Sequence, residues 1–563
     1  MFPPAFFFRS HRSSAANLFF TSVALALFAP VFPSLAQNNA APAQNEPAPA
    51  QSAAATSQND PLVVRITAGL IRGVVRSKGG AQFLGIPYAE PPVGPLRWHA
   101  PMSKKPWSGV RDANAYGSAC SQPLLGGAWN RYDAEHSSED CLYLNVDTPT
   151  WPAAKPLPVM FWIHGGANAG GSGSGGLYND GTLTYHGVVL VTMNYRLGIF
   201  GFFAHPELTR ESPHHASGDY GLMDQILALQ WVRENIARFG GDPGNITVFG
   251  QSAGSIDTGM LMTSPLARGL FQRAIGESGS PFSPPLATLA DAEKQGEQVA
   301  AKLNVPPGAE GIAALRKVAA PDLIKQIGAL ALTWPGIGPD VDGWVLPRAP
   351  AQVFNSGDEA QIPLLLGTNS REFGDSGSGD QLRAAIEQYA GDEAPQALAL
   401  YGLANGGLGA TDPLYGTAGQ QWGADTIFHC PITTEALWHL AAHDATYEYE
   451  FDHAIPGQEA QGAVHSAELP YVFGQFPTTG NIAGNFGPVD THLADLIERY
   501  WTNFAKTGDP NDSGLPTWPK LDATGRYLIF TEEGQAVPSI GPLRGPQCDL
   551  YRAVLAERMK PGN

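Results

Sequence analysis

One serine of the chain stands in a setting that can make it a nucleophile. Residues 250–254 read Gly-Gln-Ser-Ala-Gly, directly after the run Ile-Thr-Val-Phe at 246–249 and before an apolar stretch at 256–262. In a G-x-S-x-G turn from strand to helix, the serine backbone is strained and the glycines leave room, so the hydroxyl is exposed above the sheet. We therefore predict that Ser252 is a nucleophile. The stretch 276–280, Gly-Glu-Ser-Gly-Ser, lacks the last glycine and does not fit.

A glycine-rich segment upstream can supply the donors that such a nucleophile needs. Attack on a carbonyl carbon creates an oxyanion, and the loss of one preorganised donor typically costs about 2.7 to 4 kcal/mol. Residues 164–167, His-Gly-Gly-Ala, can present the amides of Gly165 and Gly166, and the residue after the nucleophile, Ala253, offers a third. The alternative is a merely flexible glycine loop, an interpretation that we keep for the later glycines at 170–176.

The elements that must position these residues follow a strand and helix pattern. Apolar runs at 158–163, 188–193 and 246–249 are each followed by His, Asn or Gly, as is typical of strands buried on both faces. Between 222 and 236, apolar residues recur at spacings of 4, 3, 3 and 4, which is one face of a helix. This order predicts an α/β fold, in which helices flank a large, mostly parallel sheet.

Two later segments complete the outline. Apolar residues between 493 and 504 have helical spacing, and Gly-Asp-Pro at 508–510 is a stop signal. Residues 375–425 are rich in Gly, Ala and Asp, and we expect a mobile, partly helical cap there.

The composition fits one large globular core. Of the 563 residues, 43% are hydrophobic and 15% charged, and the 65 Gly and 48 Pro suit a sheet with long connections better than a helical bundle. The formal net charge of -18 argues against nucleic acid and anionic membranes as partners, because both select basic surfaces. Simple solubility is the alternative interpretation of this charge.

The first 36 residues have the pattern of an export signal. Arg9 and Arg12 precede an apolar stretch at 19–28, and Ser-Leu-Ala at 34–36 is a small-residue cleavage site. An uncleaved membrane anchor is the alternative, but the apolar run is short for a span. We expect a signal peptide at 1–36 and a secreted or periplasmic protein without stable membrane insertion.

The next segment has a different composition. Residues 37–60 are Ala, Pro, Gln and Asn with almost no large apolar side chains, so they cannot bury enough surface to fold. We expect a disordered linker at 37–60 and a single catalytic domain at 61–555.

The four cysteines form an even set in a chain expected to be exported. Cys120, Cys141, Cys430 and Cys548 contain no Cys-x-x-Cys spacing, which favours disulfides over a metal site. A bond between the first two would close a loop worth about 3 kcal/mol in the chain-entropy model. The sequence alone does not fix the pairing.

At this point the chain resembles the type B carboxylesterase family, which includes cholinesterases and bile-salt-activated lipases. The resemblance runs from about residue 62 to 555 and rests on several motifs in the family's order. The matching stretches are 83–92 with 97–98, 138–145, 194–198 and 239–243. It implies an α/β-hydrolase fold and a catalytic triad in the order Ser, Glu, His.

The resemblance also locates the other two members of the triad. The segment 364–372, Leu-Leu-Leu-Gly-Thr-Asn-Ser-Arg-Glu, places the acid at Glu372, although Asp375 lies close by. The segment 465–474, which continues as Glu-Leu-Pro-Tyr-Val-Phe-Gly from residue 468, places the base at His465. The chemistry supports both residue types: a neutral imidazole can take the serine proton when a carboxylate holds the ring and offsets its charge.

Structural features follow from the same resemblance. It implies that Cys120 is bonded to Cys141, which leaves Cys430 for Cys548, and that Arg97 forms a salt bridge with Glu139.

Two positions depart from the family pattern. The family usually has Glu before the nucleophile, where this chain has Gln251, and Ser five positions after it, where this chain has Asp257. We hypothesise that Asp257 lies near Glu372 and that the two carboxyls share a proton, since like charges at close range do not both ionise easily.

The expected function is hydrolysis of a small-molecule carboxylic ester through an acyl-enzyme. We expect no cofactor and no metal, because the pair His214 and His215 lacks a third ligand at useful spacing. The alternatives are a catalytically silent adhesion protein of the same fold, a lipase or an amidase. Substrate identity and oligomeric state stay open. Four aromatic residues are candidates for lining the substrate pocket, with core packing as the alternative for each: Trp129, Trp334, Phe373 and Trp422.

Overall fold

The computed structural model describes residues 60–126, 129–178, 181–328, 337–372, 374–442 and 445–560. The predicted signal peptide at 1–36 and all of the linker except Asp60 lie outside these residues.

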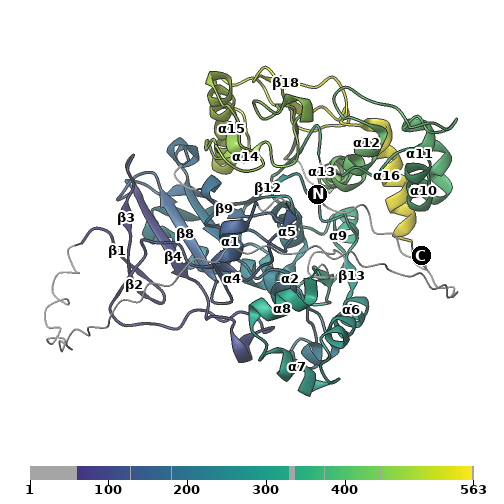
Figure 1. Cartoon of the computed structure of the whole chain (residues 1–563). Helices are drawn as coiled ribbons and strands as arrows, with labels where there is room; N and C mark the ends of the chain where they lie inside the picture. Colours follow the sequence, from purple (N-terminus) through teal and green to yellow (C-terminus); the bar gives the residue numbers. More distant parts are fainter. Residues whose placement is uncertain are drawn as a thin grey trace, which may run out of the picture. The chain divides into compact units, whose positions relative to one another are not determined.

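A mixed sheet of eleven strands organises the described part of the chain (Figure 1). Its central strands are all parallel, whereas the outer ones pair antiparallel. In spatial order the strands are β18 (Ala536–Pro538), β17 (Leu528–Phe530), β16 (Thr446–Phe451), β15 (Leu364–Asn369), β12 (Arg273–Glu277), β11 (Gly241–Gln251), β9 (Leu157–Ile163), β10 (Val189–Met193), β8 (Tyr143–Thr148), β4 (Ala81–Pro87) and β3 (Val74–Val75). The predicted strands are therefore confirmed as β9, β10 and β11, and the α/β fold class with them.

Side chains of the central strands alternate between two cores, one on each face of the sheet. On β9, Val159 and Phe161 join one core while Met160 and Trp162 join the other, because successive side chains of a strand point to opposite faces. Buried residues of α4 (Tyr220–Asn235), α5 (Ala253–Thr263), α9 (Pro350–Ser356) and α13 (Cys430–Ala442) belong to the first core, and those of α14 (Leu469–Val472) and α15 (Pro488–Thr507) to the second. The two predicted helices are thus α4 and α15.

A third cluster of buried residues lies among helices far apart in the sequence. Figure 1 shows α16 (Gly545–Arg558), in yellow, beside α10 (Gly379–Ala390), α11 (Ala394–Leu400) and α12 (Ala418–Ala424). Leu550 and Val554 of α16 pack there with Leu382, Ile386 and Trp422. The region 375–425 is partly helical, as predicted; its expected mobility stays a prediction.

Smaller elements connect these layers. The helices are α1 (Arg131–Glu135), α2 (Gly198–Gly201), α3 (Pro206–Glu211), α6 (Leu289–Lys302), α7 (Ala309–Leu315), α8 (Ala320–Ile327) and the π-helical turn η10 (Asp425–His429). The remaining strands are β1 (Val63–Ile66), β2 (Gly69–Arg72), β5 (Val110–Asp112), β6 (Ala119–Cys120), β7 (Ser137–Ser138), β13 (Ala287–Thr288) and β14 (Asp340–Val341).

Covalent and ionic bonds fix several loops. The disulfides join Cys120 to Cys141 and Cys430 to Cys548. The Arg97 guanidinium contacts both carboxylate oxygens of Glu139, at 2.6 and 2.5 Å. Both features agree with the expectations from the sequence. Within the described ranges, we find no helix that is long and apolar enough to cross a membrane.

Candidate active site

The turn between β11 and α5 has the strained backbone that the motif predicts. Ser252 has φ +56° and ψ -123°, outside the regions that L-residues ordinarily occupy. A Cβ on Gly250 would lie 2.4 Å from the carbonyl oxygen of Gly254, and one on Gly254 would lie 2.0 Å from that of Ile163. Only glycine therefore fits at both positions, and the serine side chain remains partly exposed.

An imidazole and a carboxylate from distant segments meet next to this turn. His465 Nδ1 lies 2.6 Å from Glu372 Oε2, and the Glu372 side chain is buried just beyond the end of β15. Because a carboxylate only accepts hydrogen bonds, the neutral ring carries its proton on Nδ1. The other nitrogen, Nε2, then has a free lone pair and can act as a base. Nε2 lies 3.2 Å from Nε2 of Gln251, the residue that precedes Ser252. The basic nitrogen of His465 thus faces the turn that carries the serine.

The surroundings of Glu372 favour its ionised form. Burial alone would raise the pKa of this carboxyl, but the charge and hydrogen bond of His465 and the backbone N–H of Asn369, which donates to Oε1 over 3.0 Å, lower the pKa below its usual value. The neighbouring Asp375 is exposed and its Oδ1 accepts from the Gly377 amide. Glu372, rather than Asp375, is the carboxylate that holds the imidazole.

The predicted oxyanion loop passes directly beside the serine. A Cβ on Gly165 would lie 3.0 Å from the Ser252 Cβ and 2.6 Å from the Gln251 carbonyl oxygen, so its backbone approaches as closely as a glycine allows. Gly166 adopts φ +115°, a conformation that favours glycine. Ala253 is the first residue of α5, where amides have no partner within the helix and the helix dipole favours negative charge. Gly165 and Ala253 thus lie next to Ser252, the first across the loop and the second along the chain.

A row of hydrogen bonds holds the loop at 164–168, which contains the predicted oxyanion donors. The Tyr195 hydroxyl lies 2.9 Å from both the carbonyl oxygen of His164 and Asn168 Oδ1, two acceptors that compete for its single proton. Asn168 in turn donates to Asp257 Oδ1 over 2.9 Å, and Gln225 donates to Asp257 Oδ2 over 2.6 Å. Burial of Asp257 raises its pKa to about 7, although the two amide donors oppose that shift.

The hypothesis that Asp257 shares a proton with Glu372 is wrong. Its two oxygens accept hydrogen bonds from Asn168, in the loop after β9, and from Gln225 of α4, and Glu372 is not among the groups that shift its pKa. The acid that faces Glu372 is Glu468, whose Oε2 accepts from the Asn369 side-chain amide over 2.6 Å. Burial and the charge of Glu372 raise the pKa of Glu468 to about 7.

Sequence reasoning missed Asn369 and Glu468. Each lies in a segment that resembles the family, Gly-Thr-Asn and Glu-Leu-Pro, but the sequence alone predicts no role for either residue. The structure makes Asn369 a hub, since its backbone amide holds Glu372 and its side chain bonds both Glu468 and the carbonyl oxygen of Val464, one residue before His465.

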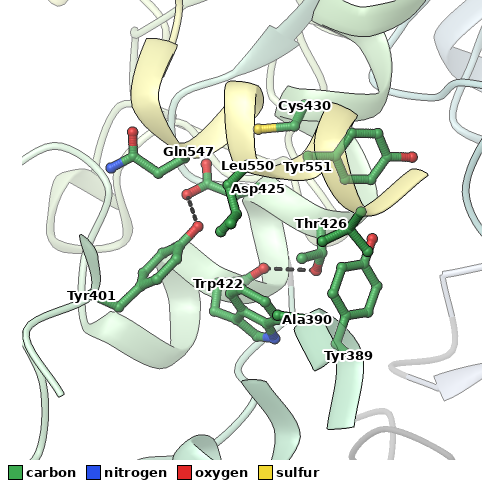
Figure 2. A pocket seen from close by; sticks show the side chains of 11 residues that line it. Tyr389, Ala390, Tyr401, Trp422, Asp425, Thr426, Cys430, Gln547, Leu550 and Tyr551 are labelled. Carbon is green, nitrogen blue, oxygen red and sulfur yellow. Dashed lines mark hydrogen bonds between the residues drawn. The ribbon is translucent and has the colours of Figure 1, made fainter. Parts of the chain in front are cut away.

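The aromatic candidates separate into two groups. Trp129 is 43% exposed, and its ring edge would lie 3.0 Å from a Cβ on Gly166, so it borders the loop at 164–168. Trp422 is a core residue, because it packs edge-on between Tyr389 and Tyr401 in the small apolar pocket of Figure 2. Trp334 and Phe373 lie outside the described residues.

An open cavity of about 320 Å³ adjoins the acid and base segments. Its lining comes from three segments: Arg371, Glu372 and Asp375 follow β15, Gln461 and Val464 precede His465, and Gln420 lies on α12. This space can receive part of a substrate. Elsewhere in the described ranges, no group of three or more His, Cys, Asp or Glu side chains is arranged to hold a metal ion.

Known proteins share this sequence and fold. A family model described as the carboxylesterase family matches residues 60–396 and 414–548. Fumonisin B1 esterase of Sphingopyxis macrogoltabida is 36% identical over 87% of this chain and 90% of its own length, and carboxylesterase 1D of Mus musculus is 33% identical over 85% and 91%. The medium-chain fatty acyl-CoA hydrolase precursor of Anas platyrhynchos is 34% identical over 79% and 83%.

Two solved esterase structures also match this chain in fold and in sequence. A structure of PNB esterase superposes with a TM-score of 0.76 at 33% identity, covering 88% of this chain and 99% of that one. A thermophilic PNB esterase gives the same TM-score and identity, with 87% and 100% covered. These matches extend over the sheet, the Ser252 turn and the segments of Glu372 and His465, and the chain belongs to the carboxylesterase family of ester hydrolases.

Proposed function

We propose that the chain hydrolyses carboxylic esters through an acyl-enzyme on Ser252. The serine oxygen attacks the ester carbonyl while His465 Nε2 takes its proton, and the alcohol leaves with that proton when the tetrahedral intermediate collapses. A water then attacks the acyl group, His465 takes a proton from the water, and the acid is released as the proton returns to the serine. Amides of Gly165, Gly166 and Ala253 stabilise the oxyanion in both steps.

The contact between His465 and Glu372 is the observation that carries this proposal. The buried Glu372 carboxylate holds Nδ1 at 2.6 Å, which orients the ring and offsets the charge of the imidazolium that each step creates. The opposite ring nitrogen faces the strained turn that bears the serine. A structural ion pair would not require this alignment with a G-x-S-x-G turn.

Small-molecule esters are the substrate class that we propose. The relatives' names refer to fumonisin B1 and to medium-chain fatty acyl-CoA, so substrates of different size occur within the matched proteins. For the present chain we propose that the cavity beside Glu372 receives one part of the ester.

The test compares wild type with Ser252→Ala on p-nitrophenyl esters of increasing acyl length. Wild type should turn over at least one member and be inactivated stoichiometrically by diethyl p-nitrophenyl phosphate, with the label on Ser252. The alanine variant should retain its thermal midpoint and lose both properties. Undiminished turnover by the variant, or a label on another side chain, would refute the mechanism.

We also propose that the protein is exported. The predicted signal at 1–36 supports this, as do two disulfides, which persist in oxidising compartments. Mass spectrometry of the mature protein should find an N-terminus after Ala36, and an intact Met1 in a cytosolic fraction would contradict export.

A further inference from the structure

His429 is a fully buried histidine that the mechanism above does not use. It ends the π-helical turn η10, and its Nδ1 lies 2.8 Å from Asp425 Oδ1 while its Nε2 lies 2.9 Å from the carbonyl oxygen of Asn369. Both partners accept hydrogen bonds, so only the doubly protonated ring satisfies both contacts. Burial lowers the pKa of His429, but the hydrogen bond and charge of Asp425 outweigh this effect and raise the pKa above its usual value.

Asp425 is itself held in place as an anion. Arg544 donates from Nε to Oδ1 over 2.9 Å and from Nη2 to Oδ2 over 2.5 Å, and the Tyr401 hydroxyl donates to Oδ2 over 2.7 Å. Figure 2 shows Asp425 facing Tyr401 and the residues of α16 that include Leu550. Every donor around this carboxylate favours its charged form, and its pKa lies below the usual value despite burial.

The Nε2 atom of His429 contacts Asn369, the hub that links the segments of Glu372 and His465. The Asn369 carbonyl oxygen accepts from His429, while the Asn369 amide donates to Glu372 and its side chain donates to the Val464 carbonyl. Displacement of Asn369 would therefore move a donor to Glu372 and the residue that precedes His465. No other described histidine bonds to this residue.

We propose that His429 is a positioning residue for ester hydrolysis. Its imidazolium is held by Asp425 and donates to the Asn369 carbonyl oxygen, which fixes the position of Asn369 and, through it, the orientation of the Glu372 carboxylate toward His465. The inference rests on the proposed triad. It concerns geometry rather than chemistry, since His429 touches no reacting atom.

Several charged and titratable groups surround His429 and affect its pKa. Asp425 lies on its own helical turn, Arg544 comes from the start of α16, and Glu448 and Glu450 come from β16. The Tyr415 ring also packs against it, at 5.6 Å between centroids. As pH rises through the pKa of His429, the ring loses one proton and one of its two bonds, so kcat should fall on an alkaline limb. Arg544 lowers this pKa, so its removal should shift the limb to higher pH.

His439 provides a matched control. It is equally buried, on α13, and its Nδ1 and Nε2 also meet a carboxylate, Glu359, and a backbone carbonyl, that of Ile362, at 3.0 and 2.9 Å. Its partners do not include Asn369. Replacement of either histidine by Gln removes a buried cation-capable ring, but only His429→Gln affects the hub.

The experiment measures kcat per active site, titrated with diethyl p-nitrophenyl phosphate, across pH. His429→Gln should lose about tenfold or more in kcat with KM little changed, because misplacement of catalytic groups acts in the transition state, and it should lack the alkaline limb. His439→Gln should retain wild-type kcat per titrated site. Equal values for the two variants, or an unchanged limb in His429→Gln, would overturn the inference.

Arg544→Gln tests the same idea if His429→Gln does not fold. Its alkaline limb should lie at higher pH than that of wild type, a shift that simple destabilisation does not produce. A limb that stays in place or moves to lower pH overturns the proposal. If the proposed triad were wrong, turnover or labelling would persist in Ser252→Ala. That result is measured separately from the pH profiles of the His429 and Arg544 variants.

Discussion

Asp257→Asn should stabilise the protein in a pH-dependent manner. Asp257 is fully buried between two amides and has no cationic partner among the described residues that shift its pKa, which burial raises from 3.8 to about 7. The Gln225 Oε1 atom has no hydrogen-bond partner within the described ranges, so a rotated Gln225 amide can accept from the new Asn side chain while Asn168 keeps its bond. The substitution therefore preserves the hydrogen-bond network and removes the titration.

The sign follows from proton linkage. Between pH 4 and 7 the native state of wild type binds a proton at Asp257 that the unfolded state has released, so wild-type stability falls as pH rises and levels off above pH 7. At about 1.36 kcal/mol per pKa unit, the loss reaches about 4 kcal/mol. The asparagine side chain does not titrate, so the variant does not lose this stability. The unfolding free energy of Asp257→Asn minus that of wild type should therefore rise by about 4 kcal/mol between pH 4 and pH 7.

Thermal unfolding of both proteins from pH 4 to 8 measures the effect. With an unfolding entropy of about 2.1 cal/mol/K per residue over roughly 500 residues, 4 kcal/mol corresponds to about 4 °C in apparent Tm. Asp425→Asn is the control, because that buried carboxylate is paired with Arg544 and His429 and its loss should destabilise the protein at pH 7. A Tm difference for Asp257→Asn that is constant across pH would refute the reasoning.

Three further predictions concern the site and its scaffold. Gly165→Ala should lower kcat/KM at least about 100-fold with normal folding, because the new Cβ would lie 2.6 Å from the Gln251 carbonyl oxygen and displace the proposed oxyanion donors; an ester assay with near-normal rates would contradict this. Gln251→Glu should move the acid limb of the kcat/KM profile to higher pH by roughly one unit, since a carboxylate would face the imidazole of His465, the proposed base; an unmoved limb argues against that contact. Joint replacement of Cys430 and Cys548 by Ser should lower the unfolding free energy by about 5 kcal/mol, as expected for a bond that spans 118 residues; a denaturation midpoint equal to that of wild type would disagree.

The sequence by itself determined the local chemistry of the site. The turn at Ser252 and the glycines beside it are properties of a few consecutive residues, because backbone strain and close approach restrict which side chains fit. Continuous apolar runs likewise predicted the strands β9, β10 and β11, because both faces of a central strand are buried. The helical spacing of apolar residues predicted α4, because a period of 3.6 places them on one face.

Only the tertiary structure decided which distant groups meet. Asp257 was expected beside Glu372 but bonds Asn168 and Gln225, because helical periodicity gives the direction of a side chain and not the identity of the element packed against it. The contact of His429 with Asn369 likewise joins residues 60 positions apart through two different elements, and no local pattern encodes it. Burial has the same origin: the raised pKa of Asp257 and the lowered pKa of Asp425 belong to the same residue type, and the difference is set by whether folding brings a cation to the carboxylate.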